Sequence, residues 1–187
     1  MTHRECEIFA GLDVSMELTS LCLVDAGGDL IWRGVCATDP RLLVAEIRRA
    51  GAGRRTRIGL ETGALSPWLV HGLRAQGFDV ICLDARHVRA ALSSRPNKSD
   101  DADGEGIAQI LRSGWYREVH VKSLATHHLR ALLAARGLMI NQRTMLSNQM
   151  RGLLKVFGVK LGSGVAGSFV RRVMAVADAD EDLAQIT

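Results

Sequence analysis

The sequence lacks the features of a secreted, membrane-embedded or cysteine-dependent protein. No apolar run approaches the ~20 residues of a membrane-spanning helix. The N-terminus has neither the long apolar core nor the small-residue cleavage site of a secretory signal. Four cysteines are scattered without a CxxC pair or a histidine at metal-ligand spacing: Cys6, Cys22, Cys36 and Cys82. We therefore expect a cytoplasmic protein with no membrane partner, whose cysteines are small buried core residues.

The composition is that of a soluble globular protein, and its charge favours a polyanionic partner. The 187 residues are 47% apolar and 24% charged, which suits one compact domain with an appendage. The net charge of +4 alone would also fit many other soluble proteins. Its distribution is more informative, because seven Lys or Arg and no Asp or Glu lie between His120 and Lys160. This stretch predicts a surface that contacts nucleic acid, with a solvated charged face as the alternative.

The first half of the chain alternates strand and helix patterns. Three apolar runs separated by turn residues predict antiparallel strands at 7–14, 18–25 and 30–36. Asp39-Pro40 and Ser66-Pro67 then mark the beginnings of two helices. Further strand patterns follow these helix starts at 56–61 and 78–84. We expect an α/β fold with a mixed five-stranded sheet and flanking helices, most economically the RNase H-like arrangement.

The second half of the chain has helical patterns. A short helix at 85–92 and a polar loop precede DDADGEGIAQILRSG, which begins as an acidic helix. A long helix is predicted from Thr126 to Phe157, and the glycine-rich tail after it resembles a flexible junction before a weak helix at 169–176. Trp115 and Tyr116 are expected to be packing residues. The predicted domains are 1–120, 121–158 for the long basic helix, and 159–187 for the junction and the beginning of a further domain.

Carboxylates in unusual places suggest a metal site. Asp13 and Glu61 lie in otherwise apolar strands, where an uncompensated carboxylate is costly. Asp100 and Asp103 are three residues apart at a helix start and project from one face, although Asp101 and Glu105 form a second acidic pair on another face. Phosphodiester chemistry needs divalent cations, and Mg²⁺ prefers such oxygen ligands. Each acid alone has an ordinary structural explanation, but together they favour a metal site.

Six sequence blocks occur in an order and spacing that resemble one family. They extend roughly from Ile8 to Gly158 and read GLDVS, LETGALSPWL, QGFDVICLDARHVRAAL, NKSDDAD, AQILRSGWYREVHVKS and LRALLAARGLMINQRTMLSNQMRGLLKVFG. The chain resembles the DEDD-type insertion-sequence transposases, a group related to the Piv DNA invertase. The N-terminal domain of that group is similar to the RuvC junction resolvase. Six blocks in order are much more specific than any single motif.

The resemblance implies a catalytic, metal-binding tetrad of Asp13, Glu61, Asp100 and Asp103, which selects this acidic pair over Asp101 and Glu105. It also implies Mg²⁺, and we expect two ions, together with DNA as the substrate. A C-terminal domain with a nucleophilic serine, a structured guide RNA in some members, and a coiled coil between catalytic domains are implied as well. The 187 residues contain no such serine domain, so we expect a truncated, decaying or separately encoded copy that is incomplete or inactive alone. Where the family has Ala and a basic residue after its last Asp, this chain has Gly104 and Glu105.

The long helix combines an apolar row with a basic sector. Its apolar row recurs every seven residues and predicts a partner helix, hence a homo-oligomer: Leu132, Met139, Leu146 and Leu153. An intramolecular core contact is the alternative. The basic sector and one residue of the NKSD block are predicted to bind nucleic acid: Arg130, Arg136, Arg143, Arg151, Lys155 and Lys98.

We predict the N-terminal domain of a DNA transposase or recombinase that cleaves and transfers strands with Mg²⁺. One alternative is a non-catalytic remnant that binds DNA or dimerises. A weaker alternative is an actin-like ATPase or sugar kinase, which has a similar first hairpin but needs a second glycine-rich phosphate hairpin that the sequence does not show.

Overall fold

The computed structural model describes residues 7–51, 55–93, 100–162 and 166–186, without the side chains of 100–102 and 166. The chain divides into two compact units, unit 1 (Met1–Thr126) and unit 2 (His127–Thr187), each described by itself. This division reflects packing, and the functional boundaries predicted at 120 and 158 stay a prediction.

Unit 1 is built on a five-stranded sheet in the order β3-β2-β1-β4-β5. Its strands are β1 (Ile8–Val14), β2 (Leu18–Asp25), β3 (Leu30–Ala37), β4 (Thr56–Glu61) and β5 (Asp79–Leu83). The first three strands form an antiparallel meander, whereas β4 runs parallel to β1 and β5 runs parallel to β4. The mixed sheet predicted from the sequence is confirmed, and its topology is RNase H-like.

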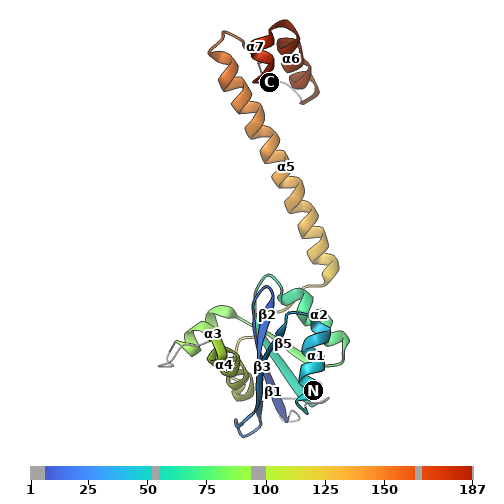
Figure 1. Ribbon diagram of the computed structural model, residues 1–187, viewed down its shortest axis with the longest axis vertical. Helices are drawn as coiled ribbons and strands as arrows, with labels where there is room; N and C mark the ends of the chain where they lie inside the picture. The colour runs from blue at the N-terminus through green and yellow to red at the C-terminus, as the bar shows by residue number, and fades with distance from the viewer. Residues whose placement is uncertain (1–6, 52–54, 94–99, 163–165, 187) are drawn as a thin grey trace. The chain divides into compact units, whose positions relative to one another are not determined.

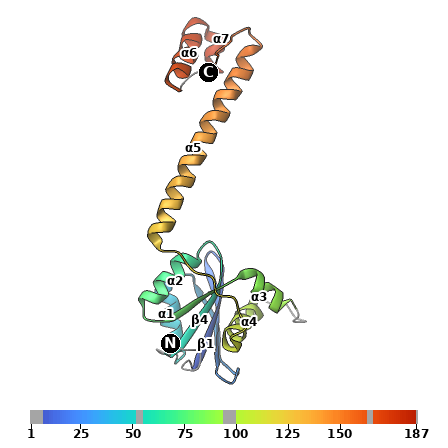
Figure 2. The same cartoon turned by 180° about the vertical axis from the view of Figure 1, so that it is seen from behind.

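Helices cover both faces of this sheet (Figures 1 and 2). The two on one face are α1 (Pro40–Arg49) and α2 (Ser66–Ala75), and the two on the other are α3 (Ala85–Leu92) and α4 (Asp100–Ser113). The Asp39 carboxylate caps α1 by accepting hydrogen bonds from the next backbone amides, as its position before proline predicts.

The period of two along each strand divides the buried residues into two cores. In β1, Ala10 and Leu12 face α1 and α2, whereas Phe9 faces α3 and α4. The sheet is therefore buried on both sides, which explains the nearly continuous apolar runs of its central strands. Cys22 and Cys82 are buried as predicted, Cys36 is half-buried, and Cys6 lies outside the described residues.

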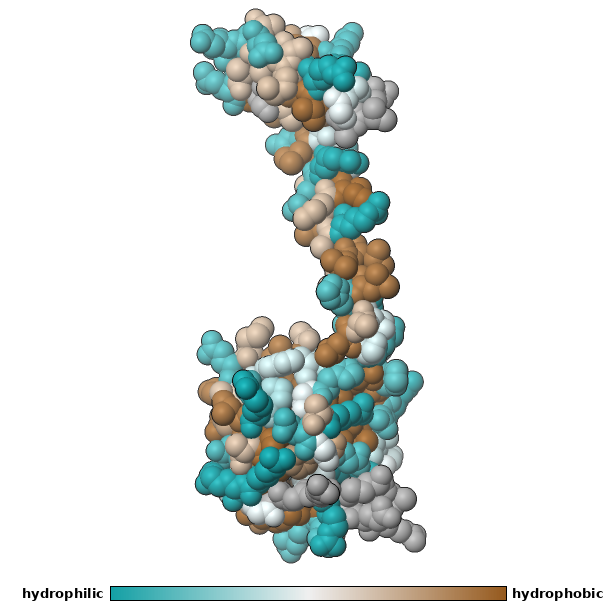
Figure 3. All heavy atoms as spheres, turned by 90° about the vertical axis from the view of Figure 1, so that its right-hand side faces the viewer, coloured by the Kyte–Doolittle hydropathy of each residue, from teal (hydrophilic) through white to brown (hydrophobic). Residues whose placement is uncertain are grey.

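The remaining helices are α5 (Leu124–Lys155), α6 (Ala166–Ala179) and α7 (Glu181–Ala184). In unit 2 a small core joins the end of α5 to α6 and α7, and its buried members are Leu154, Leu161, Phe169, Val173 and Leu183. The predicted long helix is confirmed, and the weak helix predicted at 169–176 is part of α6. Along α5, apolar side chains are exposed (Figure 3). Among the described residues, no helix is both long enough and apolar enough to cross a membrane.

Candidate carboxylate site

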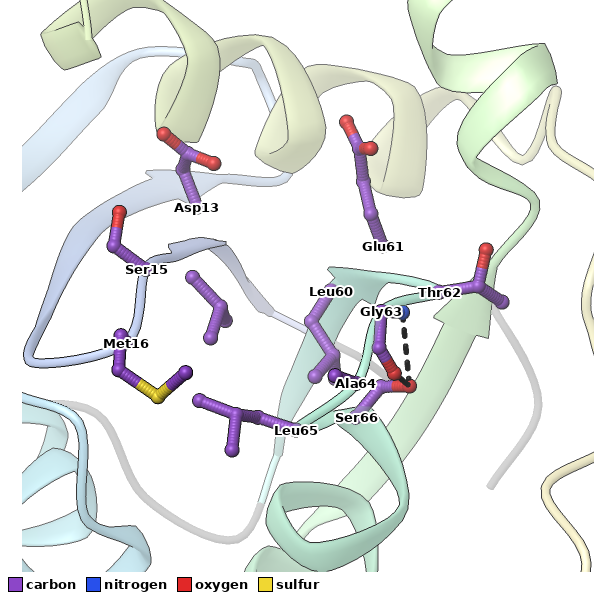
Figure 4. A pocket seen from close by; sticks show the side chains of 11 residues that line it. Asp13, Ser15, Met16, Leu60, Glu61, Thr62, Gly63, Ala64, Leu65 and Ser66 are labelled. Atoms are coloured by element: carbon purple, nitrogen blue, oxygen red, sulfur yellow. Dashed lines mark hydrogen bonds between the residues drawn. The ribbon is translucent and has the colours of Figure 1, made fainter. Parts of the chain in front are cut away.

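Asp13 and Glu61 are placed side by side by the parallel pairing of β1 with β4. Leu12 pairs with Leu60, so the next residue of each strand lies at the same level of the sheet. Because alternate residues face opposite sides, both acids lie on the face covered by α4, opposite the core of Leu12 and Leu60. Their carboxylates point to the same side in Figure 4.

Glycines allow α4 to approach this part of the sheet closely. A Cβ added at Gly11 would lie 2.1 Å from the Gly104 carbonyl oxygen and 2.4 Å from the Ala108 amide nitrogen. Gly59 of β4 pairs with Gly11 of β1, and a Cβ added at Gly59 would lie 3.1 Å from a methyl carbon of the Leu111 side chain. The helix backbone therefore lies directly on the strands, which brings the first turn of α4, with Asp103, to the two strand carboxylates.

The surroundings of Glu61 change the pKa of its carboxyl group. Its pKa is raised above its ordinary value of 4.5, first by burial and then by repulsion from Asp13 and Asp103. Arg89 on α3 acts in the opposite direction and favours the ionised form. Asp13 of β1 and Asp103 of α4 are thus close enough to Glu61 of β4 to affect its ionisation, and the role of these acids as metal ligands stays a prediction.

The carboxylates border a cavity of about 240 Å³ beyond the ends of β1 and β4. Polar groups from the loops after these strands line it, among them Ser15, Thr62 and Ser66. Ser66 fixes the loop after β4, because its hydroxyl donates to the Gly63 carbonyl at 2.8 Å and accepts from the Gly63 amide at 3.1 Å.

The donor set fits a hard divalent cation. Carboxylate oxygens are the ligands that Mg²⁺ prefers, and a bound cation would relieve the repulsion that raises the pKa of Glu61. Within the described residues, no three acidic, His or Cys side chains already form a group that could hold an ion. The Asp100 side chain, the fourth predicted ligand, is outside the described residues, as is the whole of Lys98.

Two residues that depart from the family pattern have local explanations. Gly104 is buried against β1 and β2, where an added Cβ would make only an ordinary contact with the Ser20 carbonyl oxygen at 3.4 Å. Glu105 forms an ion pair with Arg33 of β3 at 2.8 Å. The extra negative charge at Glu105 is therefore partly balanced by Arg33.

The predicted basic contacts on α5 differ in their surroundings. Arg130, Arg136, Arg143 and Lys155 are exposed. Arg151 has intramolecular partners instead: it lies 4.4 Å from the centre of the Phe169 ring and donates from Nε to the Gly162 carbonyl at 3.0 Å. Their role in binding nucleic acid stays a prediction.

Sequence reasoning missed Arg89 near the site and was wrong about Trp115, which lies outside it. Arg89 affects Glu61 from α3, and its place in the ARHVRAAL pattern could have indicated a basic helix face. The prediction that Trp115 is a packing residue is wrong, because 71% of its surface is exposed. Tyr116 does pack against the core beneath α3 and α4.

In fold and in the arrangement of its acids, unit 1 is an RNase H-like α/β domain with a carboxylate cluster at the ends of its two central strands. Residues 10–158 match the model of the IS110-type DEDD transposase family, described as "Transposase". The chain belongs to this family, as its sequence blocks predicted, and the ATPase alternative loses its support.

Similar proteins include the transposase for insertion sequence element IS1111A of Coxiella burnetii, which is 27% identical over 156 residues. That match covers 82% of this chain but only 40% of the relative. Among solved structures, Thermus thermophilus RuvC is 15% identical with a TM-score of 0.44, over 60% of this chain and 99% of that chain. The same protein in complex with a Holliday junction substrate is also 15% identical, with the same coverage and a TM-score of 0.41.

Proposed function

We propose that this chain is the strand-cleaving and strand-transferring part of a DNA transposase that acts with divalent metal ions in the cytoplasm. One observation supports this proposal most directly: strand pairing and the close approach of α4 bring Asp13 and Asp103 to a half-buried Glu61, whose pKa is raised first by burial and then by these two acids. Such mutual repulsion costs stability unless cations bind, so the cluster is suited to hold them.

Asp13, Glu61, Asp103 and Asp100 would hold the metal, which we propose to be two Mg²⁺ ions. Bound there, the ions would neutralise the charge that develops on the attacking and leaving oxygens of a phosphodiester. The protein's own contribution is to fix the carboxylates. The strand pairing and the close approach of α4 hold Asp13, Glu61 and Asp103 near one another in the folded chain. Little conformational entropy is then lost when these side chains bind an ion.

We propose DNA as the main partner. Phosphate contacts would come from Lys98 and from the α5 residues Arg130, Arg136, Arg143, Arg151 and Lys155. The exposed apolar row of α5 would join copies of the chain into a homo-oligomer. A structured guide RNA and a C-terminal serine domain, both implied by the family resemblance, would complete transposition, since this chain spans about 40% of its curated relative.

The test separates metal binding from cleavage. Thermal unfolding is measured with and without Mg²⁺ or Mn²⁺ for the unaltered 187-residue chain and for Asp13→Asn and Glu61→Gln. Asp29→Asn, in an exposed turn, is the control. At a metal concentration of about 100 times Kd we expect about 2.7 kcal/mol of stabilisation. Both site variants should lose most of it, whereas the control should keep it.

The same proteins are incubated with supercoiled plasmid and four-way junction DNA. Metal-dependent nicking that is lost in Asp13→Asn and Glu61→Gln supports the proposal. Salt-sensitive DNA binding with metal stabilisation but without nicking in any form would leave a non-catalytic DNA-binding remnant instead. Equal metal stabilisation of all four proteins would refute the metal site itself.

A further inference from the structure

A second groove lies in unit 1, beside the N-terminal part of α3. Its walls include Arg86, His87 and Ala90 of α3, together with Trp115 and Arg117 from the segment after α4. Its volume of about 470 Å³ is large enough for a nucleotide base and part of its backbone. None of these residues belongs to the carboxylate site.

The backbone after α4 places Trp115 at this groove. Gly114 ends the helix with a φ of +72°, a conformation that favours glycine, and its amide donates to the Leu111 carbonyl. The Trp115 amide then donates to the Ser113 hydroxyl at 3.2 Å. The indole meets the His87 ring nearly perpendicularly, at 80° and 5.4 Å between centroids. The side chain is therefore held in place while 71% of the residue's surface stays exposed.

The charges around this indole favour an anionic occupant. Arg86 and Arg117 are exposed, and within the described residues neither forms an ion pair. The Asp84 carboxylate also lines the groove, but it accepts hydrogen bonds from the Arg86 and His87 amides and so caps α3, which leaves two arginines against one acid. A purely apolar ligand would leave the two guanidinium groups without a partner, and a simple anion would leave the indole unused. An aromatic base attached to phosphates satisfies both.

A second hollow on α3 adjoins this groove. It is lined by Arg89 and Ser93 together with Arg86 and Ala90, which also line the groove. Arg89 is close enough to Glu61 to favour its ionised form, against the burial and the acidic neighbours that raise its pKa. A nucleic-acid strand held along α3 would thus meet Arg117, Arg86 and Arg89.

We propose that this groove binds an unpaired nucleotide of the DNA strand whose backbone reaches the carboxylates. The base stacks on Trp115, and its flanking phosphates contact Arg86 and Arg117. This inference rests on the proposed function, because the cleaved strand is the ligand that both sites would share. It adds a requirement that the metal site alone does not impose: the substrate must offer an unstacked base beside the cleavage position.

The test measures binding in EDTA, which keeps it apart from any metal-dependent step. Fluorescence anisotropy compares the 187-residue chain on a DNA single strand, the matched blunt duplex, a four-way junction and an RNA single strand of the same sequence. Trp115→Ala should weaken binding to the DNA single strand roughly 5- to 100-fold and leave the duplex nearly unchanged, whereas Trp115→Phe should keep most of the affinity. Arg86→Gln with Arg117→Gln should weaken binding to every DNA and reduce its salt dependence.

Matched controls come from the opposite face of the sheet. Trp68→Ala on α2, 43% exposed in the unaltered chain, and Arg41→Ala on α1 should change neither affinity nor salt dependence. The proposal is overturned if Trp115→Ala leaves binding to the single strand unchanged, or weakens binding to strand and duplex equally. A Trp115-dependent preference for RNA over DNA would overturn the assignment to the cleaved strand. An absence of metal-dependent nicking in the unaltered chain would count against the proposed function, whereas these binding measurements in EDTA would be unaffected, so the failures of the two proposals are distinguishable.

Discussion

Glu61 is the residue at which the folding and the function of this protein oppose each other. It ends a buried strand, and its carboxylate is half-buried beside Asp13 and Asp103. Burial and these two charges make ionisation unfavourable in the folded chain, whereas binding a cation requires the ionised form. A raised pKa at a site that would bind metal is the expected result of this conflict.

This conflict predicts how stability depends on pH. Because the pKa of Glu61 is higher in the folded chain than its ordinary 4.5, the folded chain retains the proton over a range in which the unfolded chain has lost it. Its contribution to stability therefore falls as pH rises from 4.5 to the raised pKa and stays low above it. Without divalent metal, Glu61→Gln should become more stable relative to the unaltered chain across this window.

Urea unfolding from about pH 4 to about pH 8 measures this difference. Adding Mg²⁺ at neutral pH should reverse the order, since only the unaltered chain binds the ion well. Asp29→Asn serves again as the control and should show no such window. A stability difference between Glu61→Gln and the unaltered chain that does not vary with pH would contradict the assigned environment.

At the scale of elements, the position of α4 is set by contacts between backbones. Gly11 lacks the side chain that would otherwise separate β1 from the helix backbone at Gly104 and Ala108. Gly106 does the same for α3, since an added Cβ would lie 2.3 Å from Leu92. The helix that supplies Asp103 is thus positioned by close backbone contact at these glycines, together with polar contacts such as the ion pair of Glu105 with Arg33.

Two alanine substitutions should therefore have opposite effects. Gly11→Ala forces its Cβ against the Gly104 and Ala108 backbone and should destabilise the chain by about 2–3 kcal/mol. Gly104→Ala has room and replaces a poor helix former, so it should stabilise by up to about 1 kcal/mol. Urea unfolding gives both values. Stabilisation by metal should also decrease in Gly11→Ala, because the helix that carries Asp103 is displaced. If both variants unfold like the unaltered chain, the close packing of α4 on β1 is wrong.

Much of this arrangement follows from local sequence. Strand alternation and turn residues predict the sheet, and the acids in otherwise apolar strands single out Asp13 and Glu61 as candidate site residues. Contacts between distant segments could not be predicted in the same way. The ion pair of Glu105 with Arg33 joins residues 72 positions apart, and the Gly11 contact depends on how closely a helix approaches a strand. The exposure of Trp115 likewise depends on the turn at Gly114, which one sequence does not reveal.

At the scale of the whole molecule, the exposed apolar row of α5 is the feature that the proposed chemistry does not explain. The exposed fractions of its four heptad residues are 58% for Leu132, 69% for Met139, 61% for Leu146 and 46% for Leu153. Among the described residues of α5, Leu154 near its C-terminal end is buried, in the core of unit 2. Apolar rows of this length along a helix are normally buried, and a seven-residue period suits a second helix of the same kind.

We therefore expect the chain to self-associate through α5. Met139→Glu with Leu146→Glu places charges in the middle of the row and should convert the assembly to monomers in sedimentation velocity. Asn141→Glu is the matched control, because at 100° per residue Asn141 lies on the side of the helix away from the row. Neither change should alter the unfolding of unit 1, since both lie in unit 2. A monomeric unaltered chain at micromolar concentration, or an assembly that survives both charges, would show that the row has another partner.

If assembly places two carboxylate sites on one DNA, the double variant should also lose paired strand cleavage while it retains single nicks, because each site remains intact in the monomer.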